Sequence, residues 1–182
     1  AAPELVDLAA SVSFAENTVN AAPQLIDGSV RLSDADSANF NGGRLVVSIV
    51  PAGQNQHDLP FTQDQLGIRS VGTGTGQVAV SGGSVSYEGS TIGTITSGGA
   101  NGAALVVGLN ANATAAAVEA LIEHLTYANT VSDPATTRLV SIRLDDGAGG
   151  AMAPRVVQIN VNADVDGAVA LFGEQQVNTY EP

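Results

Sequence analysis

The chain of 182 residues contains no cysteine and no tryptophan. The absence of cysteine rules out disulfide bonds, thiolate catalysis, cysteine-ligated zinc sites and iron–sulfur clusters. Stabilisation beyond ordinary packing must therefore come from hard cations, which bind oxygen ligands. Aromatic residues make up only 4% of the chain, and the abundant small residues Gly, Ala, Ser, Thr and Val suit packing between β-sheets.

Positive charge is also scarce. Six Lys and Arg residues stand against 18 Asp and Glu residues, which gives a formal net charge of −12. The excess of acid attracts cations, although the same charge also simply keeps a protein in solution. The basic residues are scattered and form no patch to neutralise phosphates, so we expect no nucleic-acid partner. They are Arg31, Arg44, Arg69, Arg138, Arg143 and Arg155.

Long apolar runs are missing as well. None approaches the roughly 20 residues that a bilayer-spanning helix needs, and the opening segment AAPELVDLAA lacks the positive charges of a signal peptide. We expect a soluble chain without membrane insertion, either mature or excised from a longer one. Its length is typical of one domain, with or without extensions.

Short β-like segments separated by turn residues dominate the sequence. This punctuation is typical of an all-β sandwich. Alternation is clearest in RLVSIRL, where Val140, Ile142 and Leu144 share one face and are expected to point inward. The predicted strands are residues 11–14, 28–32, 44–50, 66–71, 77–80, 84–89, 91–95, 104–109, 137–144 and 155–161.

One segment has helical spacing. In NATAAAVEALIEHL the apolar residues recur at intervals of three and four, which predicts a short helix near residues 114–125 across the sandwich. Asn112 or Thr114 can cap its start, and capping explains Asn112 better than glycosylation at the NAT sequence. The glycine-rich VGTGTG (71–76) is followed by neither lysine nor a helix, so it predicts a hairpin turn and not a phosphate loop.

Catalytic material is poor. His57 lies in the polar segment GQNQHDLP, and His124 lies at the end of the predicted helix, where an exposed imidazole suits the helix dipole. No nucleophile elbow or similar local signature supports a Ser–His–Asp triad. We therefore expect no enzymatic activity.

Acidic pairs follow three predicted strands. Calcium takes six to eight oxygen ligands from carboxylates and carbonyls on loops, and an Asp-x-Asp pair can place two carboxylates on one ion. Asp and Gly are also ordinary turn residues, and for any single loop that interpretation is favoured; the set of three favours calcium. The pairs are Asp34 with Asp36, Asp145 with Asp146, and Asp164 with Asp166.

Over about residues 11–163 the sequence resembles the cadherin-like repeats of giant bacterial surface adhesins, many of which also carry repeats-in-toxin segments. The resemblance implies a Greek-key sandwich of the cadherin or immunoglobulin type. The segments that carry it are FAENTVNAAPQLID (14–27), LSDADS (32–37), LNANATAAAVEALIEHLTYANT (109–130), SDPATTRLVSIRLDDGAGG (132–150) and VVQINVNAD (156–164).

The resemblance also implies calcium sites at both ends of the sandwich. In cadherins, four acidic segments bind calcium at the junctions between modules. They are a Glu-Asn pair on the first strand, an Asp-Ala-Asp motif after the second strand, an acidic loop between the last two strands, and an acidic linker. We expect Asp34, Asp36 and Asp145 to cluster at the N-terminal end, and Glu16 and Asp164 at the opposite end. The residues at matching positions are Glu16, Asp34, Asp36, Asp145 or Asp146, Asn162 and Asp164.

Departures from the family concern the linker and the middle of the chain. The linker VNADVDG is less complete than the linker of a cadherin. Residues 51–125 are expected to hold more strands than a cadherin module has, and a helix as well. The final segment FGEQQVNTYEP resembles the opening strand of a different repeat. We expect residues 1–10 to form a linker or strand, 11–163 the sandwich, and 164–182 a linker with the start of a following module or an exchanged strand.

Three functions follow in order of preference. The first is a non-catalytic, calcium-stiffened module of a large extracellular protein, joined to neighbouring modules of the same polypeptide. The second is a filament or surface-layer subunit that donates a terminal strand, 168–177 or 3–8, to an identical subunit. The third is carbohydrate or protein binding through the loops, which the few scattered aromatic residues disfavour.

Overall fold

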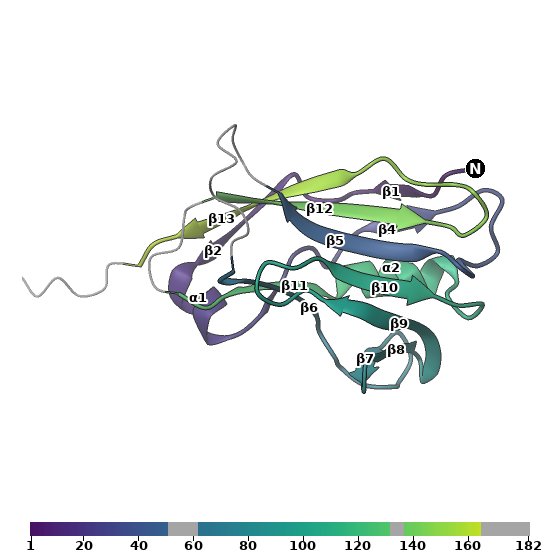
Figure 1. The fold of residues 1–182 in the computed structure, drawn as a ribbon, viewed down its shortest axis with the longest axis horizontal. Helices are drawn as coiled ribbons and strands as arrows, with labels where there is room; N and C mark the ends of the chain where they lie inside the picture. Colours follow the sequence, from purple (N-terminus) through teal and green to yellow (C-terminus); the bar gives the residue numbers. More distant parts are fainter. Residues whose placement is uncertain (51–61, 132–136, 165–182) are drawn as a thin grey trace, which may run out of the picture.

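The computed structural model describes residues 1–50, 62–131 and 137–164. In these residues the chain is mostly β-strand, arranged in three sheets with a sandwich-like architecture (Figure 1). The predicted all-β class is therefore confirmed. The large sheet has the spatial order β2 (Ser11–Ala15), β13 (Arg155–Asn162), β12 (Thr137–Asp145), β5 (Arg44–Val50), β10 (Leu105–Leu109), β9 (Ser90–Gly98), β8 (Ser84–Tyr87) and β7 (Val78–Ser81).

Two smaller sheets complete the described part of the fold. A three-stranded sheet has the order β3 (Gln24–Leu25), β11 (Leu125–Asn129) and β6 (Asp64–Ile68). A two-stranded sheet pairs β1 (Glu4–Val6) with β4 (Arg31–Ser33). Every pairing is antiparallel except that of β2 with β13, which is parallel.

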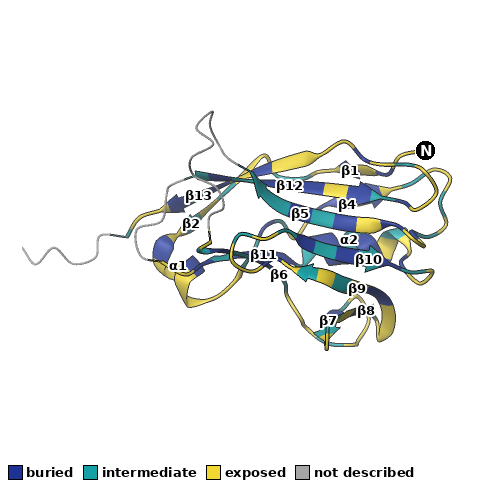
Figure 2. Ribbon diagram, viewed as in Figure 1, coloured by how far each residue is buried: buried dark blue, intermediate teal, exposed yellow. Residues whose placement is uncertain are grey.

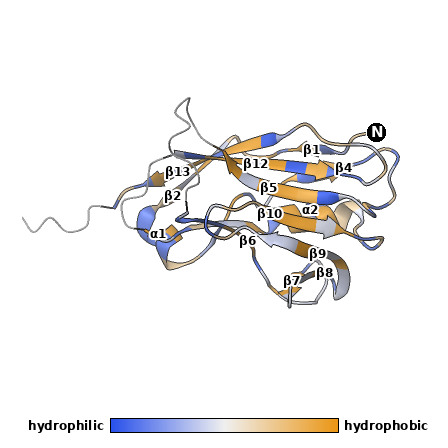
Figure 3. Ribbon diagram, viewed as in Figure 1, coloured by the Kyte–Doolittle hydropathy of each residue, from blue (hydrophilic) through white to orange (hydrophobic). Residues whose placement is uncertain are grey.

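The core lies on the inward face of the large sheet. The alternation predicted for β12 is confirmed, because Val140, Ile142 and Leu144 are buried. Buried segments along β12 are dark blue in Figure 2. Hydrophobic stretches run along β5 and β12 (Figure 3). Burial of each such aliphatic side chain stabilises the fold by about 1.5–3 kcal/mol. The alternation therefore determines which face of the strand points into the core.

Two helices in the described residues pack on the strands. The predicted helix is confirmed as α2 (Ala115–Glu123), whose N-cap Thr114 accepts a hydrogen bond from the backbone N–H of Ala117 through its side chain. Its apolar face, which includes Leu121, is buried. The sequence did not predict α1 (Glu16–Ala21), a helix of six residues with Val19 as its buried apolar side chain. One apolar residue gives no helical period. Both helices are too short to cross a bilayer.

A buried polar cluster joins the large sheet to the three-stranded sheet. Arg138 on β12 is fully buried, and its Nε donates a hydrogen bond of 2.6 Å to Oδ2 of Asp64 on β6. The other Asp64 oxygen accepts from the Tyr127 hydroxyl at 2.6 Å and from Asn129 Nδ2 at 2.8 Å. Burial raises the pKa of the Tyr127 hydroxyl above its ordinary value. Buried charge is tolerated here because each group has a partner.

β2 and β13, which are the first and last strands of the large sheet along the sequence, lie side by side. Ser11 pairs with Gln158, and Ala15 pairs with Asn162. Because the pairing is parallel, both strands end together, far from the end of β12. The chain after β2 therefore lies beside the chain after β13.

Candidate metal site

Three aspartates converge at one end of the sandwich. Asp34 and Asp36 follow β4, and Asp146 follows β12. One carboxylate oxygen from each lies within 4.8 Å of the others. We call this end the N-terminal pole. The sequence predicted that the loops after these two strands meet at one end, with Asp145 beside Asp34 and Asp36; the two loops do meet, but the third aspartate of the group is Asp146.

In Asp34 the two carboxylate oxygens have different surroundings. Oδ1 accepts hydrogen bonds from the backbone N–H groups of Asp36 at 3.1 Å and Ser37 at 3.2 Å. This is the turn chemistry typical of aspartate. Oδ2 is buried and has no hydrogen-bond partner among the described residues. The turn and ligand roles are thus compatible, because each uses its own oxygen.

Asp146 shows the same division more strongly. Its side chain is buried, with the residue only 2% exposed. Oδ1 accepts from the backbone N–H groups of Ala148 at 2.7 Å and Gly150 at 2.8 Å. Oδ2 is buried without a hydrogen-bond partner in the described part of the chain. A buried carboxylate oxygen without a partner is destabilising unless a cation compensates it.

Glycines allow the two loops to approach closely. A Cβ on Gly147, which has a φ of 77°, would lie 2.3 Å from the carbonyl oxygen of Asn41. A Cβ on Gly43 would lie 2.1 Å from the carbonyl oxygen of Asp145. Glycine at positions 43 and 147 therefore permits a backbone approach that a side chain at either position would prevent.

Gly150 makes room for two oxygens. The position that its Cβ would occupy lies 2.1 Å from Asp146 Oδ2 and 2.1 Å from the carbonyl oxygen of Ala1. The Ala1 carbonyl is thus a neighbour of the unpartnered carboxylate oxygen. No pattern in the sequence places residues 1–3 at this pole, so the sequence did not predict the position of Ala1.

The Ala1 ammonium group also contacts the cluster. It donates to Oδ2 of Asp36 in an exposed ion pair. The hydrogen bond with Asp36, reinforced by the nearby carboxylates, raises the pKa of this ammonium, and the same hydrogen bond lowers the pKa of Asp36.

Asp145 differs from expectation. It was predicted to lie with Asp34 and Asp36, but the group of three contains its neighbour Asp146 instead. The reason is strand alternation: Asp145 ends β12 paired with Arg44 of β5, on the face opposite the buried Leu144. Its Oδ1 accepts from the backbone N–H of Gly147 at 2.8 Å.

The opposite pole brings together Glu16 and Asp164. The backbone N–H of Asn17 donates to Asp164 Oδ2 at 2.7 Å, and the backbone N–H of Asp164 donates to Glu16 Oε2 at 3.3 Å. Glu16 is buried, whereas Asn162 is exposed. The predicted proximity of Glu16 and Asp164 is confirmed. Asp166 lies outside the described residues.

The histidines form no site within the described residues. His124 lies at the C-terminal end of α2, as predicted, with Nδ1 2.7 Å from the carbonyl oxygen of Ala120. His57 lies outside the described residues. What the described loops assemble is a set of oxygen ligands, which suits a hard cation.

Comparison of the chain with protein-family models, with curated proteins and with solved structures gives no match.

Proposed function

We propose that the chain is a non-catalytic, calcium-binding structural module of a large extracellular bacterial surface protein. The observation that carries this proposal is Asp146, whose carboxylate has a buried oxygen without a hydrogen-bond partner among the described residues and lies in one group with the carboxylates of Asp34 and Asp36. A cation bound there compensates its charge. The resemblance to cadherin-like adhesin repeats supplies the extracellular setting.

Calcium fits this set of ligands better than other metals. The donors are carboxylates on loops, with the Ala1 carbonyl oxygen beside them, and the chain has no cysteine. Calcium accepts irregular oxygen coordination, whereas magnesium demands near-octahedral geometry and keeps its water. Three carboxylates and one carbonyl leave positions for water or for a neighbouring module.

The arrangement of strands supports the finer assignment to a cadherin-like Greek-key sandwich. The chain crosses between sheets several times: it passes from β2 in the large sheet to β3 in the three-stranded sheet, through β4 to β5 in the large sheet, and on to β6 in the three-stranded sheet, before β7 to β10 return to the large sheet. Connections that cross between two layers are typical of Greek-key sandwiches. They also carry the acidic loops to the ends of the molecule.

The second pole completes the proposal. Glu16 and Asp164, with Asn162 and Asp166 nearby in sequence, would supply the other half of a junction to the next module. Calcium bound between modules would restrict bending, so that a row of modules acts as a stiff spacer.

Thermal unfolding in EDTA, in millimolar calcium and in millimolar magnesium tests the proposal. A ligand that binds only the folded state at 100 times its Kd adds about 2.7 kcal/mol of stability, or about 5–10 °C in Tm for a chain of this size. We expect the rise with calcium and a much smaller one with magnesium.

A matched pair of variants locates the site. Asp146→Asn removes the charge of the buried ligand and is expected to abolish the calcium-dependent rise. Asp145→Asn alters the adjacent residue outside the cluster and is expected to retain it, since an amide oxygen can still accept from Gly147. A calcium shift of equal size in both variants would exclude the N-terminal pole as the site.

A second candidate is self-assembly by strand exchange. It is favoured by β2, which forms an edge of the large sheet in the described part of the chain and can receive a strand. Of the two predicted donors, residues 3–8 include β1, which pairs with β4 of its own chain, and 168–177 lie outside the described residues. Polymers that persist in electron micrographs after deletion of 168–182 would exclude the C-terminal donor.

A further inference from the structure

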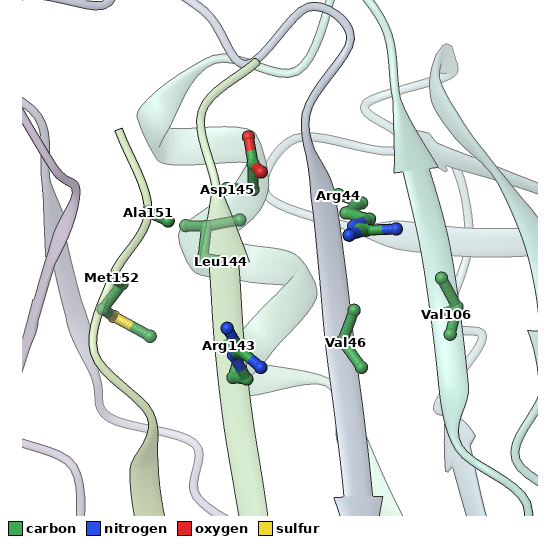
Figure 4. Close-up of a pocket in the computed structure, with 8 residues that line it drawn as sticks. All are labelled: Arg44, Val46, Val106, Arg143, Leu144, Asp145, Ala151 and Met152. Carbon is green, nitrogen blue, oxygen red and sulfur yellow. The ribbon is translucent and has the colours of Figure 1, made fainter. Parts of the chain in front are cut away.

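A cavity of about 330 Å³ lies on the outer face of the large sheet (Figure 4). It is formed by β5, β10 and β12, and by the chain after β12. Alternation explains its lining: the side chains of Leu45 and Val47 are buried in the core, so those of Arg44 and Val46 point to the other face. The lining residues are Arg44, Val46, Val106, Arg143, Leu144, Asp145, Ala151 and Met152.

The cavity holds two exposed arginines, Arg44 and Arg143. Neither forms a salt bridge or a side-chain hydrogen bond with any described residue, whereas Arg31 and Arg138 are both paired with carboxylates. Asp145 is the cross-strand partner of Arg44 but forms no ion pair with it among the described residues. The cavity is therefore locally positive in a chain whose net charge is −12.

Apart from Asp145, the rest of the lining is apolar. Val46 and Val106 face each other across β5 and β10, where they are register partners, and both are half-buried. The Met152 thioether lies at the opposite side, beyond β12. An apolar surface beside two guanidinium groups is complementary to an amphiphilic anion.

We propose that this cavity binds a carboxylate that is attached to a short aliphatic body. Arg44 and Arg143 donate charge-assisted hydrogen bonds to the carboxylate, and Val46 and Val106 contact the aliphatic part. The volume lies at the lower end of the range for small-molecule sites. This site is distinct from the cluster at the N-terminal pole, because Asp145 and Asp146 point to different faces.

The test compares two probes that differ only in charge, N-acetyl-L-leucine and N-acetyl-L-leucinamide. Each is titrated into the full chain in EDTA, and amide chemical shifts are followed by NMR. The acid is expected to bind about tenfold more tightly than the amide, with shifts on β5, β10 and β12. Since EDTA removes calcium, the result is independent of the metal proposal.

Variants assign the interaction to the two arginines. Arg44→Gln and Arg143→Gln are each expected to weaken binding of the acid about threefold, and the double variant about tenfold, because both groups are solvent-exposed. Arg155→Gln is the matched control. Arg155 is also exposed, but it is the cross-strand partner of Ile142 and so lies on the face of the large sheet opposite the cavity.

Three outcomes would overturn the proposal. They are equal affinity for the acid and the amide, no binding of the acid at millimolar concentration, and an Arg155→Gln effect as large as that of Arg143→Gln. Unchanged Tm values of the variants would show that weakened binding is not a loss of folding. Arg44→Lys and Arg143→Lys keep the charge and are expected to retain most of the affinity.

Discussion

Replacement of Arg138 by methionine should destabilise the fold severely. Methionine keeps much of the aliphatic stem but leaves the Asp64 carboxylate, which is fully buried, without the cation that donates to Oδ2 at 2.6 Å. Removal of one partner from a buried ion pair costs about 3–5 kcal/mol. For a chain of this size that corresponds to a Tm lower by about 6–20 °C.

A double-mutant cycle with Asp64→Asn separates charge from packing. Asparagine keeps an oxygen that can accept from Tyr127 and Asn129, and it removes the uncompensated charge. Arg138→Met with Asp64→Asn should therefore be less destabilised than the sum of the single variants, with a coupling energy of about 1–3 kcal/mol by urea unfolding. Strict additivity, or an Arg138→Met variant as stable as the parent chain, would refute the interpretation that this pair joins the sheets.

Three further predictions concern the N-terminal pole and α2. Gly150→Ala should displace Asp146 and weaken calcium binding measured by calorimetry, whereas Gly28→Ala, whose Cβ would approach nothing closer than 3.8 Å, should not. Acetylation of Ala1 removes the ion pair with Asp36. Its effect on Tm should be fully present between pH 3.8 and pH 8.0, which are the ordinary pKa values of an aspartate side chain and of a terminal amine. It should vanish as pH falls through the lowered pKa of Asp36 or rises through the raised pKa of the amine; a difference that persists unchanged at pH values beyond both of these pKa values would contradict the assignment. Thr114→Ala should lower stability by about 1 kcal/mol through loss of the N-cap, and Thr114→Ser should not; equal Tm values for the two variants would exclude the cap.

The inward face of β12 and the position of α2 could be predicted from the sequence because both depend on local periodicity. Val140, Ile142 and Leu144 alternate over a long strand, and α2 has three apolar residues, Val118, Leu121 and Ile122, at helical spacing. The approach of the loop that holds Asp34 to the loop that holds Asp145 and Asp146 was predictable for a different reason: both loops follow strands that end at the same pole. Strand direction alone places them there.

Other features depend on contacts between distant segments. Arg138 lies in the alternating pattern at an inward position, yet nothing near it in sequence identifies Asp64 as its partner. The choice between Asp145 and Asp146 depends on where β12 ends, and a shift of one residue exchanges the two faces. The approach of the Ala1 carbonyl to Asp146 depends on the course of the first residues over the pole.

The parallel pairing of β2 with β13 has a mechanical consequence. The chain enters β2 from the N-terminal side and leaves β13 toward the C-terminal side. Tension applied along the chain on either side of the sandwich therefore pulls these two strands along their axes in opposite directions. Their hydrogen bonds, evenly spaced in a parallel ladder, are then loaded together in shear. Strands pulled apart from one end would instead lose the same bonds one after another, at lower force. Before this pair is reached, the short β1–β4 pairing would give way, so the molecule would lengthen slightly and then resist.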